Sequence, residues 1–161
     1  MAEPAPGTRA YYAQAAGTEL LWVFGLSVLH CVALFYFGVI MMLALGVQVL
    51  INNHFIEAAR AEGRLASPPL VIAVDALAAS LLLGAGLLAR TGVGVLVLPA
   101  LVFYAADTLV VGWLVSKFPR DLMLILALAF HGYMTYSLFK RWSLMRQAPA
   151  PSQTNALDSP L

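Results

Sequence analysis

The stretch LVFYAADTLVVGWL, Leu101 to Leu114, is apolar throughout except for one carboxylate, that of Asp107. It belongs to a run from Val93 to about Val115 that is long enough to cross a membrane, because a spanning helix needs about 20 mostly apolar residues. A carboxylate in the middle of such a helix is costly, so it normally faces the interior of a helical bundle and pairs with another polar group. The stretch therefore predicts a membrane helix with a buried polar contact.

The overall composition supports a membrane protein. Of the 161 residues, 61% are hydrophobic and 11% are charged, and the mean hydropathy is +0.85. Soluble domains carry about a quarter charged residues. The sequence contains nine basic and eight acidic residues and no cluster of basic residues, so we expect no nucleic-acid binding. The single cysteine, Cys31, offers neither a disulfide nor a cysteine-based zinc site, and we expect no metal.

Four runs in the sequence are long and apolar enough to span a bilayer. We expect the spans at residues 20–43, 70–89, 93–115 and 122–139, with Pro99 as a tolerated kink in the third. The charged connection at 52–69 has apolar residues at helical spacing, which predicts a short interfacial helix after the first span. The other connections are short, so neighbouring helices should be antiparallel. The predicted fold is an all-α membrane protein, an up-down bundle of four transmembrane helices.

The predicted bundle occupies residues 20–142. Residues 1–19 form a polar N-terminal segment, and residues 143–161 lack a periodic apolar face, which predicts a disordered C-terminal tail. Four spans place both termini on one side of the membrane. That side would hold five Lys or Arg residues against four on the other, and this bias favours cytoplasmic termini in the cell (inner) membrane.

The second and third spans share a pattern of small residues that follow an aspartate. In the second span Asp75 is followed by small residues at every fourth position, and Asp107 is followed by a similar set in the third. Small residues at this spacing let helix backbones approach closely, against each other or against a partner. The predicted packing residues are Ala76, Ser80, Gly84, Thr108, Gly112 and Ser116.

Counting along the helices places three ionisable side chains at one depth. Asp107, His131 and His30 each lie ten residues from a predicted membrane surface, about 15 Å deep. Asp75 lies nearer the surface, where Tyr36 is its expected neighbour. We therefore expect Asp107 to pair with His131, with His30 as its next candidate partner.

Three functions fit this polar group. The first is an accessory or assembly subunit, in a homo-oligomer or a larger membrane complex within the lipid bilayer, in which the Asp and His side chains only fix helix register. The second is a proton-linked transporter or channel component that uses Asp107 and His131, with Tyr104 on the same helix face. The third is a b-type haem protein with His30 and His131 as axial ligands. The sequence contains no common catalytic motif, so an enzyme is not favoured.

Overall fold

The computed structural model of the chain describes residues 4–37, 61 and 68–149. Within these ranges the chain is all-helical, as predicted. The helices are α1 (Arg9–Phe37), α3 (Pro68–Arg90), α4 (Val97–Lys117) and α5 (Leu122–Gln147). The interfacial helix expected in the 52–69 connection lies outside the described residues, apart from Ala61 and the two prolines that begin α3.

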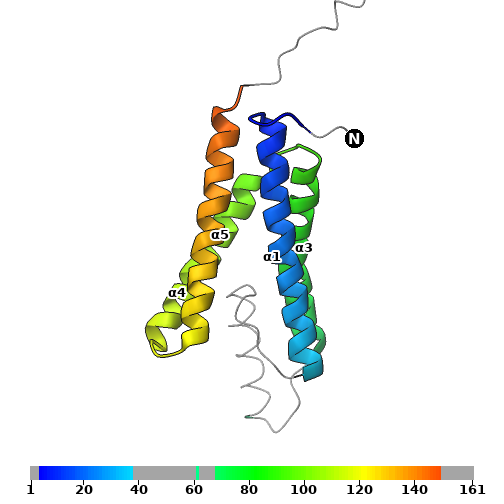
Figure 1. Ribbon diagram of the computed structural model, residues 1–161. Helices are drawn as coiled ribbons and strands as arrows, with labels where there is room; N and C mark the ends of the chain where they lie inside the picture. Colours follow the sequence, from blue (N-terminus) through cyan, green and yellow to red (C-terminus); the bar gives the residue numbers. More distant parts are fainter. Residues whose placement is uncertain (1–3, 38–60, 62–67, 150–161) are drawn as a thin grey trace, which may run out of the picture.

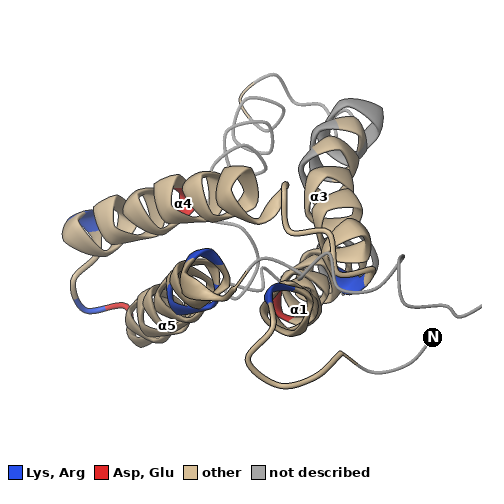
Figure 2. Ribbon diagram, turned by 90° about the horizontal axis from the view of Figure 1, so that it is seen from above, with Lys and Arg blue, Asp and Glu red and all other residues tan. Residues whose placement is uncertain are grey.

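Successive described helices run in opposite directions (Figure 1). Helix α1 packs along both α3 and α5, whereas α4 packs chiefly along α5. In the view from above, α4 is inclined away from α3 (Figure 2). The molecule is therefore built from two antiparallel pairs, α1 with α3 and α4 with α5, which meet where α1 contacts α5.

Helix α1 begins at Arg9, well before the predicted start at Leu20, so most of the predicted polar segment 1–19 is helical. Two local causes explain the difference. The Thr8 hydroxyl accepts a hydrogen bond of 3.2 Å from the backbone N–H of Tyr11, which caps the helix. The residues that follow are rich in alanine, the strongest helix former. The predicted end of this helix at residue 43 lies outside the described residues.

The boundaries of α3 nearly match the prediction, but α4 begins at Val97 rather than at residue 93. A tight turn separates the two helices. The backbone N–H of Gly92 donates to the carbonyl of Ala89 at 2.9 Å, and Gly92 has a φ of 89°, a left-handed conformation that suits glycine. Pro99 consequently lies in the first turn of α4, where its missing N–H breaks no helical hydrogen bond. The expected kink is therefore not required.

Helix α5 begins after Asp121, whose carboxylate accepts hydrogen bonds from the backbone N–H groups of Met123 at 2.9 Å and Leu124 at 3.2 Å. It continues to Gln147, past the predicted end at residue 139. Trp142 and Met145 pack against the core, which explains why the helix does not end at the bilayer boundary inferred from the sequence. The predicted disordered tail is therefore helical at its start, and residues 150–161 lie outside the described part.

The outer surface of the described helices carries many large apolar side chains. Large apolar side chains point outward on every described helix, among them Trp22 at 68% and Leu109 at 76% exposure, whereas Asp107 and His131 are buried. Helices α4 and α5 are each long and apolar enough, by length and composition, to cross a membrane. The core that joins the helices is largely aliphatic. It contains Ala16, Leu20, Val23, Leu82, Ala85, Ala89, Val97, Ala100, Leu101, Tyr104, Met134 and Leu138.

Candidate functional site

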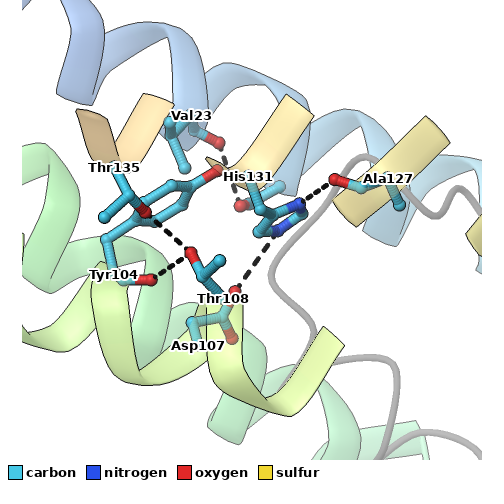
Figure 3. Close-up of polar contacts among 8 residues, drawn as sticks. Val23, Tyr104, Asp107, Thr108, Ala127, His131 and Thr135 are labelled. Atoms are coloured by element: carbon cyan, nitrogen blue, oxygen red, sulfur yellow. Dashed lines mark hydrogen bonds and ion pairs between the residues drawn. The ribbon is translucent and has the colours of Figure 1, made fainter. Parts of the chain in front are cut away.

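The predicted contact between Asp107 and His131 is confirmed. The Asp107 Oδ2 atom of α4 lies 3.3 Å from the His131 Nε2 atom of α5, and the two side chains are 1% and 0% exposed (Figure 3). This distance suits an ion pair, although Nε2 makes no well-aligned hydrogen bond to any described residue. Asp107 has further interactions besides this one. Two ionisable groups from neighbouring helices thus meet in the interior of the bundle.

The other nitrogen of His131 fixes the orientation of the imidazole ring. Nδ1 lies 2.8 Å from the backbone carbonyl of Ala127, one turn earlier in α5. A carbonyl oxygen only accepts, so Nδ1 must carry the proton. Nε2 then faces the Asp107 carboxyl group at 3.3 Å. Two ionisable groups that face each other in this way cost far less to bury than two separate charges.

Tyr104 and two threonines surround the pair. The Tyr104 ring stacks on His131 with a centroid distance of 5.3 Å and an interplanar angle of 4°. One turn further along α4, the Thr108 hydroxyl donates to the Tyr104 carbonyl at 2.9 Å and lies 2.7 Å from the Thr135 hydroxyl of α5. Figure 3 shows these groups gathered between α4 and α5. The sequence predicted Tyr104 and Thr135 near His131 and Thr108 among the packing residues, but it did not predict the contact between the two threonines.

Helix α1 supplies the third wall of the site. Val23, Ser27 and His30 lie on one face of α1, and all three are almost completely buried. The Ser27 hydroxyl donates to the Val23 carbonyl at 2.9 Å, so it is satisfied within its own helix. The Tyr104 ring is directed from α4 toward Val23, and its hydroxyl is buried without a hydrogen bond to any described residue (Figure 3). His30 is partnered and fully buried, and its expected approach to Asp107 stays a prediction.

A second polar cluster lies nearer the end of the bundle that holds the chain termini. The Glu19 Oε1 atom of α1 accepts from the Ser137 hydroxyl at 2.8 Å and lies 3.4 Å from the Arg141 Nε atom, both of α5. His131 and Ser137 are about 9 Å apart along the helix axis. Thr135, which contacts Thr108, lies between them on α5. Aliphatic side chains of the core are buried in the same bundle, among them Leu20, Val23, Met134 and Leu138.

The expected contact between Asp75 and Tyr36 concerns side chains outside the described part of the structure. Their backbones belong to α3 and α1 respectively.

The two sets of small residues have different environments. On α3, Ala76, Ser80 and Gly84 are exposed, so this face does not contact another described helix. On α4, Thr108 contacts α5 through Thr135, Gly112 lies near Leu128, and Ser116 is exposed. The packing of the two grooves against each other is therefore not seen among the described residues. Their packing against a partner stays a prediction.

A close contact between α1 and α3 involves two glycines that the sequence analysis did not identify. A Cβ atom placed on Gly17 of α1 would lie 2.7 Å from the backbone oxygen of Gly86 of α3, closer than any real side chain approaches. The signal was available, because Ala13 and Gly17 have the small-residue spacing of a helix interface. It was missed because the first helix was expected to begin only at Leu20. Glu19 was missed for the same reason.

The site does not fit a haem with His131 as a ligand. An axial histidine must direct one ring nitrogen at the iron. In His131, Nδ1 contacts the Ala127 carbonyl at 2.8 Å, Nε2 faces Asp107 at 3.3 Å, and the Tyr104 ring covers one face. In the part of the chain that the structure describes, no group of three or more His, Cys, Asp or Glu residues could hold a metal ion.

The chain matches no family model, no curated protein and no solved structure. The functional argument therefore rests on the geometry of these residues.

Proposed function

We propose that the chain is an integral membrane protein with four spanning helices and cytoplasmic termini, and that it is an accessory or assembly subunit of a larger complex in the cell membrane. The observation that carries the membrane assignment is the apolar outer surface, together with the burial of two ionisable groups. Asp107 and His131 are 3% and 0% exposed, whereas large apolar side chains cover the outside of all four described helices. In water this surface would favour aggregation, but lipid tails would solvate it.

In this proposal the Asp107–His131 pair has a structural role. Its ring orientation is fixed by the Ala127 carbonyl and by stacking on Tyr104. Beside the pair, the Thr108 and Thr135 hydroxyls also join α4 to α5. Polar contacts between membrane helices fix which helices pair and at which register. They therefore support a role in helix registration.

The exposed small-residue face of α3 supports the assembly role. Ala76, Ser80 and Gly84 lie along one side of this helix, and a Cβ atom added to Gly84 would meet no atom within 4 Å. Such a face allows the backbone of another spanning helix to approach closely. Its occupant in the proposed complex is a helix of a second protein or of a second copy of this chain.

Purification in mild detergent followed by native mass spectrometry tests the proposal. We expect a stoichiometric partner or a homo-oligomer, and we expect Gly84→Leu to dissociate it while the monomer stays folded. Gly25→Leu is the matched control, because a Cβ atom on Gly25 in α1 also meets nothing within 4 Å. A wild-type chain that is monomeric under all mild conditions would contradict the accessory role.

Proton-linked transport is the second candidate. It is favoured by three buried polar atoms that have no hydrogen bond in the described residues: Glu19 Oε2, Tyr104 Oη and His131 Nε2. Proteoliposomes that contain a pH-sensitive dye would compare proton flux through the wild type and Asp107→Asn. Equal proton flux in both proteins would rule out this candidate. Proton flux in the wild type that is lost in Asp107→Asn would show that the pair takes part in transport and would contradict the purely structural role.

A further inference from the structure

A wide groove lies at the end of the bundle where the described chain begins and ends. Its volume is about 1020 Å³, and it is formed by the start of α1, the turn between α3 and α4, and the end of α5. Its lining includes Thr8, Arg9, Gly92, Gly94, Met145 and Arg146. Neither the Asp107–His131 pair nor the Glu19 cluster contributes to this lining, so the groove is a separate feature of the molecule.

Two guanidinium groups line this groove, and each is held from one side. The Arg9 Nε atom donates to the Ala148 carbonyl at 2.9 Å, which leaves its two terminal amino groups to contact a ligand. The Arg146 guanidinium lies 5.2 Å from the centre of the Trp142 ring, a cation–π contact that restrains its plane and leaves its N–H edges available. Two restrained guanidinium groups on one groove suit a phosphate, which they bind with several parallel hydrogen bonds.

The charge around the groove supports an anionic ligand. Among the described residues, five basic side chains lie toward this end of the bundle, at the start of α1, at the end of α3 and in the last two turns of α5: Arg9, Arg90, Lys140, Arg141 and Arg146. The acidic side chain described near them is Glu19, which is already engaged by Ser137 and Arg141. No described carboxylate lines the groove itself. The surface here therefore attracts phosphate groups.

The position of the groove along the helices selects the source of the phosphate. Because about 20 residues of helix cross the hydrocarbon core, a span that begins at Leu122 reaches the headgroup level near Trp142. Arg146 follows one turn later, at the depth of lipid phosphates. We propose that this groove binds the headgroup of an anionic phospholipid through Arg9 and Arg146. The inference rests on the proposed membrane location and adds a specific lipid contact to it.

Native mass spectrometry of the full chain in detergent tests this inference, with phosphatidylglycerol and phosphatidylcholine as the two added lipids. We expect retained phosphatidylglycerol adducts and about tenfold weaker retention in Arg146→Gln, the loss that follows from one charge-assisted contact. The double variant Arg9→Gln/Arg146→Gln should lose the preference for the anionic lipid. Arg120→Gln is the control, because Arg120 is exposed at the opposite end of the bundle.

Three results would overturn the inference. These are equal retention of the two lipids, unchanged retention in both arginine variants, and displacement of phosphatidylglycerol by inorganic phosphate at equal concentration, which would identify a general anion site. Failure of the membrane proposal itself is distinguishable, because the chain would then remain monodisperse in buffer without detergent.

Discussion

The two helix pairs of this molecule are joined by opposite means. Helices α1 and α3 meet where two glycines remove all side-chain bulk, so that a Cβ atom on Gly17 would lie 2.7 Å from the Gly86 oxygen. Helices α4 and α5 meet through side chains, with Asp107 3.3 Å from His131 and the Thr108 and Thr135 hydroxyls 2.7 Å apart. We call the contact at Gly17 and Gly86 the glycine seam and the contact between α4 and α5 the polar seam. The glycine seam depends on the absence of side chains, and the polar seam depends on specific polar side chains.

For a bundle in the proposed membrane location, the difference shows how helix pairing can be specified in apolar surroundings. In lipid the hydrophobic effect does not drive helices together, so association depends on close packing and on polar contacts. Close packing at Gly17 and Gly86 brings the backbones of α1 and α3 together, but it selects the partner helix only through the shape of its surface. A buried ion pair identifies one residue on each helix, and it thereby fixes the register of α4 against α5.

Breaking the ion pair should have the largest effect. Asp107→Leu or His131→Leu leaves the other ionisable group without its 3.3 Å partner, and loss of one member of a buried pair costs about 3–5 kcal/mol. The double variant Asp107→Leu/His131→Leu should recover part of this loss, because no separated charge stays buried. The free energy of unfolding, measured by denaturing detergent titration in micelles, checks the expectation.

Ser116→Leu is the control for these variants, because it also adds bulk to α4 but at an exposed position. It should change the free energy of unfolding by less than about 0.5 kcal/mol. Losses in the two single variants that add up independently in the double variant would show that the two residues do not act as a pair.

Adding one methyl group to the glycine seam should have an intermediate effect. Gly17→Ala places a Cβ atom within 3.0 Å of three atoms of α3, and such overpacking costs about 1–3 kcal/mol. The same change at Gly25, also in α1, meets nothing within 4 Å and should stabilise the helix by about 0.5–1 kcal/mol.

The two alanine variants should therefore differ in sign, which thermal unfolding in mild detergent can measure. If Gly17→Ala stabilises the chain as much as Gly25→Ala does, the α1–α3 contact is looser than described, and the contrast between the two seams disappears.

The sequence predicted the polar contact better than it predicted the small-residue seam. The position of Asp107 in an apolar run, and its distance from the helix end, were sufficient to select His131, because burying an ionisable group requires a partner at the same depth. Gly17 lies in a segment that hydropathy alone assigns to the polar N-terminus. Its role depends on a helix capped by Thr8, and no count of apolar residues reveals that cap.

Helix ends were similarly difficult to predict. Hydropathy locates the part of a helix that would lie in lipid, but α5 continues to Gln147 because Trp142 and Met145 pack on the core. The repeated small residues of α3 and α4 were recognisable as a pattern, yet Ala76 and Gly84 are exposed while Thr108 contacts α5. Which face of a helix is covered depends on how its neighbours are inclined, and α4 is inclined away from α3 (Figure 2).

Removing one hydroxyl from the α4–α5 seam should have the smallest effect. Because the Thr108 hydroxyl donates to the Tyr104 carbonyl, Thr135 must donate to Thr108, and Thr135→Val deletes that donor while it keeps the shape of the side chain. Hydrogen bonds between membrane helices average about 0.6 kcal/mol, and we expect a loss of this size in the free energy of unfolding. Thr18→Val is the control, because the Thr18 hydroxyl donates within its own helix to the Gln14 carbonyl. A loss in Thr135→Val as large as that in His131→Leu would show that the hydroxyls, and not the ion pair, set the register of these two helices.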